Sequence, residues 1–104
     1  MKVIYNNIIP FPGYKAINLF GTLFVRKGYV IDAVDYNHEA IHTAQMKELF
    51  YIIFYLWYLV EWFVLLFKYG DTHKAYRNIR FEKEAYDHEK DLDYLKYRPK
   101  YNYI

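Results

Sequence analysis

The stretch Asn37-His38-Glu39-Ala40-Ile41-His42-Thr43-Ala44-Gln45 contains the pattern H-E-x-x-H. On a helix, His38 and His42 project from one face, so their imidazole nitrogens can bind one zinc ion. Glu39 lies beside them, where its carboxylate can take a proton from zinc-bound water. The stretch therefore predicts a helix that carries two metal ligands and a general base, and the rest of the chain has to supply a third ligand.

The composition predicts one domain and excludes several kinds of site. A chain of 104 residues is long enough for a single hydrophobic core. It contains no cysteine, which excludes disulfides and thiolate metal ligands. A net charge of +2 is too balanced to indicate nucleic-acid binding. Aromatic residues make up 23% of the chain and favour large packing surfaces, a membrane boundary or self-association.

The first 30 residues predict a small antiparallel sheet. Residues 2–9 are rich in β-formers, and a segment with two prolines and a glycine then interrupts the chain. Residues 16–26 indicate a strand or a bent pair of strands, with Gly21 at the bend. Within them, Thr22 to Arg26 alternate as a half-buried or edge strand does.

Helical segments are expected to follow the sheet, so the whole predicts a small α+β fold. These segments are an active-site helix at 32–48, a hydrophobic helix at 49–69, a glutamate-bearing helix at 72–95 and a tail at 96–104. Asp32 can cap the first helix, with Asp35 in the capping-box position. Gly70 predicts the end of the second helix, and Asp71 can cap the third.

The hydrophobic helix is long enough to cross a membrane, since residues 49–67 contain a single charge, Glu61. Semi-polar side chains recur along it at helical spacing: Tyr51, Tyr55, Tyr58 and Trp62. A glutamate in mid-span needs a partner. We expect a buried or homodimer-forming helix ahead of one that contacts a membrane. No signal peptide is visible, so the expected location is cytoplasmic or membrane-associated.

The third metal ligand must be an Asp, Glu or His, and the downstream candidates cluster in residues 80–88. H-E-x-x-H followed by a helix with E-x-x-A-(D) resembles the gluzincin metallopeptidases, especially the membrane-linked CAAX-protease and heat-shock-protease branch and the very small minigluzincins. The resemblance covers roughly residues 22–46 and 77–89. It implies a minimal zincin-like fold in which Glu82 binds zinc. Glu84 and then His88 are the alternatives, because their side chains are also possible zinc ligands.

The sequence departs from that pattern at Tyr86, which stands where the family has an aspartate that orients a zinc-binding histidine. A tyrosine hydroxyl can hydrogen-bond to a histidine or to an oxyanion, but it supplies no charge. Tyr76 and Tyr86 are the candidates for contacts of this kind.

Distance sets a further condition on the site. If residues 32–69 formed one straight helix, Gly70 would lie about 42 Å from His42, at ~1.5 Å per residue. Glu82 would then be too far away to reach the histidines. We therefore expect the helix to break between Met46 and Phe50. Otherwise, Glu82 would have to bind the zinc ion of a second chain.

The resemblance implies a zinc-dependent metallopeptidase that cleaves a peptide or protein substrate. Glu39 would activate the zinc-bound water as general base. Strand 22–26 would pair with the extended substrate, and the tail 96–104 would block the site in a self-inhibited form. The alternative is a non-catalytic aromatic-rich interaction or membrane-associated protein with a structural or degenerate zinc site.

Overall fold

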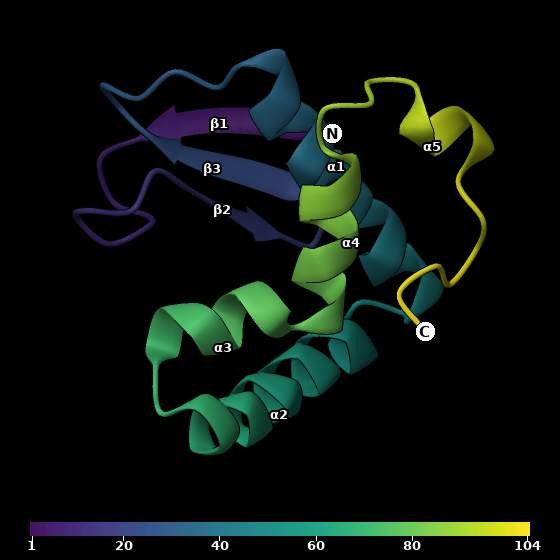
Figure 1. The fold of residues 1–104 in the computed structure, drawn as a ribbon. Coiled ribbons are helices and arrows are strands. Elements are labelled where there is room, and N and C mark those ends of the chain that lie inside the picture. The colour runs from purple at the N-terminus through teal and green to yellow at the C-terminus, as the bar shows by residue number, and fades with distance from the viewer.

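Three strands and five helices make up the chain, which the computed structural model describes from residue 1 to residue 104 (Figure 1). The strands are β1 (Lys2–Asn6), β2 (Ala16–Leu19) and β3 (Thr22–Arg26). The helices are α1 (Ala33–Glu48), α2 (Ile52–Tyr69), α3 (Thr72–Asn78), α4 (Arg80–His88) and α5 (Tyr94–Tyr97). The predicted α+β class is confirmed.

The sheet is mixed, in the order β1-β3-β2, and not antiparallel throughout as the sequence predicts. β2 runs antiparallel to β3, with Leu19 opposite Thr22, whereas β1 runs parallel to β3. Asn6 at the end of β1 and Ala16 at the start of β2 both lie at the Arg26 end of β3. β2 and its flanking turns thus serve as the crossover that a parallel pair requires. The strand expected at an edge is therefore central, and β1 and β2 carry the free edges.

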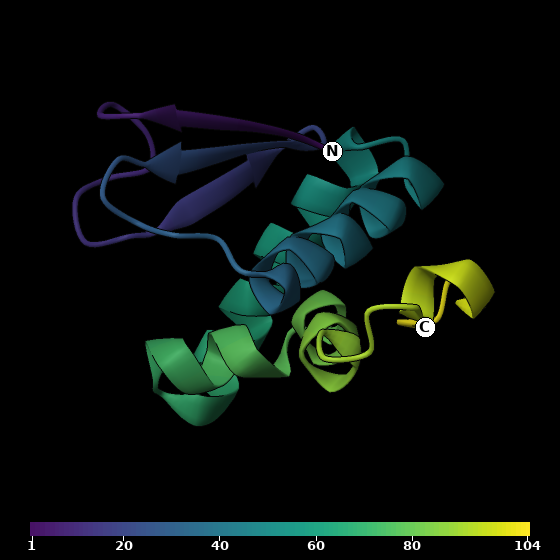
Figure 2. The ribbon, with the colours of Figure 1, turned by 90° about the horizontal axis from the view of Figure 1, so that it is seen from above.

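Helix α1 lies between the sheet and α4 (Figure 2). Its start is fixed as predicted, because Asp32 and Asp35 form a reciprocal capping box. Asn18 on β2 ties the sheet to the helix, since its amide donates to the Glu39 carbonyl and to the Thr43 hydroxyl, both at 3.0 Å. Leu23 lies fully buried in β3. The sheet thereby holds the middle of α1 in place.

The chain leaves the helical conformation after Glu48, within the segment Met46 to Phe50 where a break is predicted. α1 ends at Glu48 and α2 begins at Ile52. Phe50 and Tyr51 take positive φ angles of 54° and 61°, and the Tyr51 N–H donates to the Met46 carbonyl at 2.8 Å. This turn reverses the chain, which allows α4 to return alongside α1.

The prediction of a single helix at 72–95 is wrong, because this segment forms the three helices α3, α4 and α5. Ile79 separates α3 from α4 with an extended ψ of 131°, and its side chain is fully buried. The Glu61 carboxylate accepts from the Arg80 N–H at 2.5 Å and from its guanidinium at 2.6 Å. Glu61 therefore satisfies a backbone donor that a continuous helix would have bonded internally. No glycine or proline marks this junction.

The tail packs against the helices and does not enter the cavity beside the H-E-x-x-H helix. Tyr103 joins the core formed by Met46, Phe54, Ile79 and Phe81. Arg98 pairs with Glu84 at 2.6 Å and with Glu48 at 2.9 Å. No residue of 96–104 lines that cavity. The expected blocking of the site by the tail is therefore wrong, because buried ion pairs and apolar packing hold the tail elsewhere.

The Glu84–Arg98 pair makes stability depend on pH. Burial alone would raise the pKa of Glu84, but hydrogen bonds from Arg98, Gln45 and Tyr94 outweigh it and hold the pKa below its usual value. A lowered pKa adds stability above the unfolded-state pKa of about 4.3, and this stability is lost as pH falls through the folded-state value. We expect Glu84→Gln to cost about 3 kcal/mol at pH 7 and to flatten the loss of stability below pH 4.3.

Urea unfolding from pH 7 to pH 3 measures both effects. Asp93→Asn is the control, because it removes only an exposed pair with Lys96 and should cost less than about 0.5 kcal/mol. Acid profiles for wild type and Glu84→Gln that run parallel would contradict this role of the pair.

Candidate metal centre

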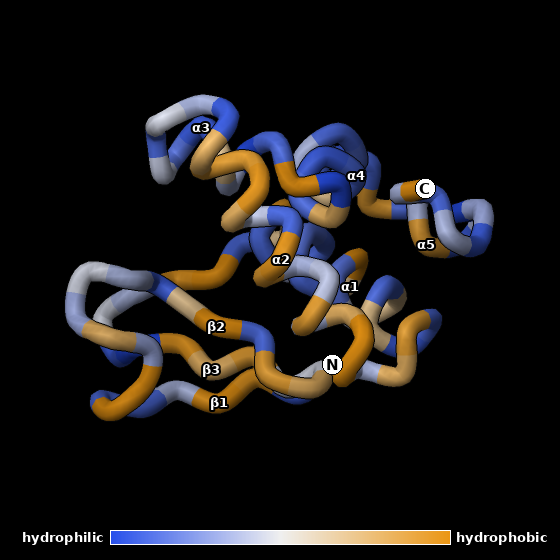
Figure 3. The backbone as a smooth tube through the Cα atoms, turned by 90° about the horizontal axis from the view of Figure 1, so that it is seen from below, coloured by the Kyte–Doolittle hydropathy of each residue, from blue (hydrophilic) through white to orange (hydrophobic).

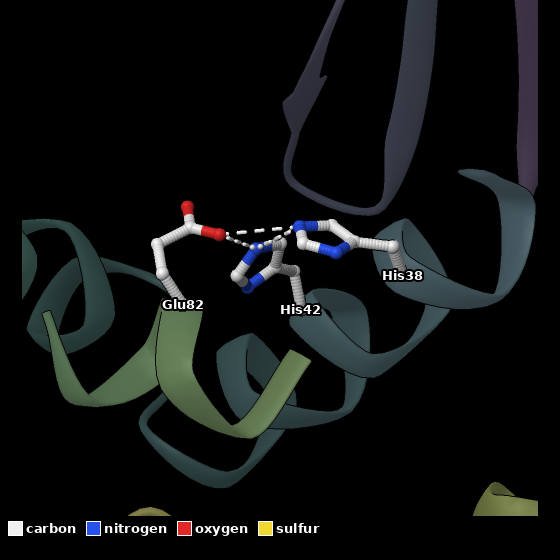
Figure 4. Close-up of side chains that lie close together, drawn as sticks. All are labelled: His38, His42 and Glu82. Carbon is white, nitrogen blue, oxygen red and sulfur yellow. Dashed lines mark hydrogen bonds and ion pairs between the residues drawn. The ribbon is translucent and has the colours of Figure 1, made fainter. Parts of the chain in front are cut away.

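Three donor atoms from two helices converge in the interior (Figure 4). The Nε2 atoms of His38 and His42 on α1 lie 3.2 Å apart. Glu82 Oε1 on α4 lies 3.1 Å from His38 Nε2 and 2.9 Å from His42 Nε2. All three residues are buried. The structure therefore brings together the three residues that the sequence and the family resemblance predict as ligands.

The spacing of these atoms fits a tetrahedral metal ion. Zinc bonds of about 2.0–2.1 Å at tetrahedral angles place ligand atoms ~3.3 Å apart. The observed separations of 2.9–3.2 Å are slightly shorter than that value, so a small outward shift of the ligand atoms admits an ion. Two imidazoles and one carboxylate are also the ligand types that zinc takes in catalytic sites. The residues present therefore fit zinc, with one coordination position left for water or substrate.

In each histidine, the outer ring nitrogen Nδ1 forms a hydrogen bond to a side-chain oxygen, which orients the ring. His38 Nδ1 lies 2.9 Å from Glu89 Oε1, and His42 Nδ1 lies 2.8 Å from Gln45 Oε1. Carboxylate and amide oxygens are acceptors, so each Nδ1 donates its proton outward. Each Nε2 atom then points at Glu82, and its lone pair becomes available to a metal ion once the proton shared with Glu82 is displaced. Hydrogen bonds of this kind fix the tautomer and the ring angle of metal-binding histidines.

Glu89, and not Tyr86, is the hydrogen-bond partner of the His38 Nδ1 atom. The Tyr86 ring packs edge-on against the His38 ring, 4.6 Å away, and its hydroxyl bonds to that of Tyr76 at 2.9 Å. Glu89 is the C-cap of α4 and lies seven residues after Glu82, two helical turns along the same face, so α4 and its cap present both carboxylates to His38. Sequence analysis misses Glu89, although its spacing from Glu82 is the signal that could have found it.

Both carboxylate oxygens of Glu82 accept hydrogen bonds. Its Oε2 accepts from the Tyr58 hydroxyl at 2.7 Å, a contact from α2 that sequence analysis also misses. Burial alone would raise the pKa of Glu82, but the charge of His42 and hydrogen bonds from both histidines hold it well below its usual range. Burial alone would lower the pKa of His42, but Glu82 raises it to about 9. Without a metal, the three side chains thus share a proton that a cation would displace.

Glu39 lines a cavity beside this cluster. The cavity has a volume of about 700 Å³, and His42 and Glu82 line it as well. Burial raises the pKa of the Glu39 carboxyl, while the neighbouring histidines pull it down. A carboxyl with a raised pKa is a better proton acceptor near neutral pH than an exposed one. The carboxyl that the motif predicts as a general base therefore lines the same cavity as His42 and Glu82 and has a raised pKa.

The free edge of β2 forms one wall of the cavity. The Asn18 carbonyl accepts from the Tyr55 hydroxyl at 3.1 Å and so points away from β3. Backbone groups of alternate residues share an edge in an antiparallel strand, so Ala16 also presents its N–H and C=O there. Strand β3 cannot bind substrate as expected, because it is paired on both sides. β2 is the edge strand that lines the cavity.

The alternative ligands lie elsewhere. The Glu84 carboxylate is bound by Arg98, Gln45 and Tyr94. The His88 ring stacks on Tyr94, with ring centroids 3.9 Å apart. Neither side chain joins the cluster of His38, His42 and Glu82.

No protein-family model, curated protein or solved structure matches this chain. The resemblance to gluzincins stays a prediction from two sequence motifs.

We expect purified protein to bind about one zinc ion per chain and to lose it in both His42→Ala and Glu82→Ala, because each change removes one of three donors. His88→Ala is the matched control and should keep the metal. Inductively coupled plasma mass spectrometry after reconstitution and desalting measures this. Zinc kept by Glu82→Ala and lost by His88→Ala would move the third ligand to His88.

Glu89 should strengthen zinc binding without being a ligand itself. We expect Glu89→Ala to weaken zinc binding by about 10- to 100-fold, because His38 loses the acceptor on Nδ1. Glu89→Gln should lose less, since its amide oxygen can still accept that proton. Competition with a chelating dye gives the affinities. Equal affinities in wild type and Glu89→Ala would exclude this role.

Proposed function

We propose that this protein is a zinc-dependent metallopeptidase of the gluzincin type. His38, His42 and Glu82 hold the metal, and Glu39 is the general base. The observation that carries the proposal is the convergence of the three donor atoms within 2.9–3.2 Å of one another, with Glu39 beside them in an open cavity.

The chain supplies the groups that peptide hydrolysis needs. Zinc, when bound, supplies a Lewis acid that polarises the peptide carbonyl and makes a water molecule more acidic. The Glu39 carboxylate accepts the proton that water loses as its oxygen bonds to the carbonyl carbon. The same carboxyl then gives that proton to the nitrogen as the C–N bond breaks. The products are a new carboxyl terminus and a new amino terminus.

Tyr76 is the stronger candidate for stabilising the oxyanion. It lines the main cavity with Glu39 and Glu82, whereas Tyr86 packs on His38 outside that cavity. Burial raises the pKa of Tyr76, so its hydroxyl keeps its proton and can donate it in a hydrogen bond.

The cavity favours an extended peptide with an apolar side chain near the cleaved bond. Ala16 at the free edge of β2 offers backbone groups that can pair with an extended chain. The opposite walls are aromatic, with Tyr55 and Trp62 from α2 and Tyr76 from α3. A cavity of about 700 Å³ admits a few residues and no folded domain. The proposed substrate is therefore a peptide or an unfolded protein segment.

A non-catalytic interaction protein with a structural metal site is the second candidate. The observation that favours it is the large apolar face that α2 turns outward, which is unusual for a small soluble enzyme.

Glu39→Gln separates the two candidates. The amide keeps the size of the side chain but cannot accept the proton, so we expect cleavage to fall by about 10²- to 10⁴-fold while zinc stays bound. The assay is hydrolysis of a quenched fluorescent peptide library by the zinc-loaded protein. Asp87→Asn, an exposed change on α4, is the control and should retain wild-type activity. Undetectable cleavage by wild type, with zinc bound, would support the second candidate.

A further inference from the structure

Helix α2 carries many hydrophobic residues (Figure 3), and those on one of its faces are exposed to solvent. Its members are aliphatic or phenylalanine side chains, each 48–89% exposed: Ile52, Ile53, Leu56, Leu59, Val60, Phe63, Val64 and Phe67. We call these residues the outer stripe. Their spacing repeats every three or four positions, which gives the broad apolar face that helices normally bury against another element.

The opposite side of α2 packs against the rest of this domain. Phe54 is buried in the core, and Tyr58 donates to Glu82. Glu61 pairs with Arg80 and also accepts from Trp57 at 3.3 Å. The helix therefore cannot rotate to hide the outer stripe without breaking the contacts that hold the metal centre.

We propose that the outer stripe pairs with the outer stripe of a second copy of this chain. Eight side chains of this kind, about half exposed or more, expose roughly 800 Å² of apolar surface. A monomer rarely carries more than about 300–600 Å² in one patch. A stable interface buries about 800 Å² on each partner, so a second copy would cover the stripe completely.

The pattern of the stripe suits a two-fold axis. In such a dimer the same patch meets itself, and two α2 helices would cross antiparallel. The middle of the stripe lies between Leu59 and Val60, so these residues lie nearest the axis. The large side chain of Phe67 then faces the smaller residues at the other end of the stripe, around Ile52. Leu56 likewise faces Phe63.

The charges around α2 favour protein over lipid as the occupant. Helices that dock on membrane surfaces carry Lys and Arg along the borders of their apolar face. Lys68 is the only basic residue on α2, at its last turn, although the helix is long and apolar enough to cross a membrane. A membrane-spanning helix would place Glu61 and Tyr58 in lipid, whereas here they bond to Arg80 and Glu82.

A charge at the axis tests the pairing. Wild-type protein should sediment in detergent-free buffer at about twice the chain mass of 12.8 kDa. Leu59→Glu places two carboxylates together in an apolar interface and should raise the dimer dissociation constant by more than ~100-fold. Leu92→Glu, at an exposed leucine off α2, is the matched control and should remain dimeric. Mixing Leu59→Glu with Leu59→Lys protein should restore a dimer as a mixed pair.

A cysteine test does not depend on the charged variants folding. The chain has no cysteine, so Leu59→Cys introduces a single thiol close to the axis. Mild oxidation should then join two chains rapidly, while Leu92→Cys should not cross-link. Wild-type protein that stays at 12.8 kDa at 100 µM overturns the proposal, as does monomeric protein that binds phosphatidylcholine vesicles through the stripe.

Discussion

The contact between the Glu82 carboxylate and the two histidine Nε2 atoms is the interaction on which the rest of the fold depends. It joins α1 to α4 across about forty residues of chain. A buried carboxylate is tolerated only when charged partners and donors surround it, and here His38, His42 and Tyr58 provide them. The turn at Phe50 and the short α3 bring α4 back to that point.

The interface between α1 and α4 is unusually polar for a domain of this size. Asn37, His38, His42 and Gln45 lie on the buried face of α1, with Ile41 among them. The Asn37 amide donates to carbonyls at the end of α4, and Gln45 donates to the Phe81 carbonyl and to Glu84. A network in which each buried group has a partner fixes one register between two helices. The domain therefore sets the geometry of the metal centre through hydrogen bonds, with the aromatic core on α2 as support.

Local signals in the sequence predict the parts of the fold that local chemistry decides. The cap at Asp32, the glycine at Gly70 and the histidine spacing each depend on a few neighbouring residues. The end of α3 at Ile79 does not, because Glu61 on another helix decides it. The order of the strands is likewise non-local. The family motif predicts Glu82 as a ligand, whereas Glu89 is not one of the motif's residues and only its spacing from Glu82 points to it.

The central claim is that one metal ion is bound by His38, His42 and Glu82. Anomalous diffraction at the zinc edge, from crystals grown with one equivalent of zinc, tests it most directly. A single peak within about 2.2 Å of both Nε2 atoms and of Glu82 Oε1 is the predicted result. No peak at this position, or a peak at Glu84 or His88 instead, would contradict it.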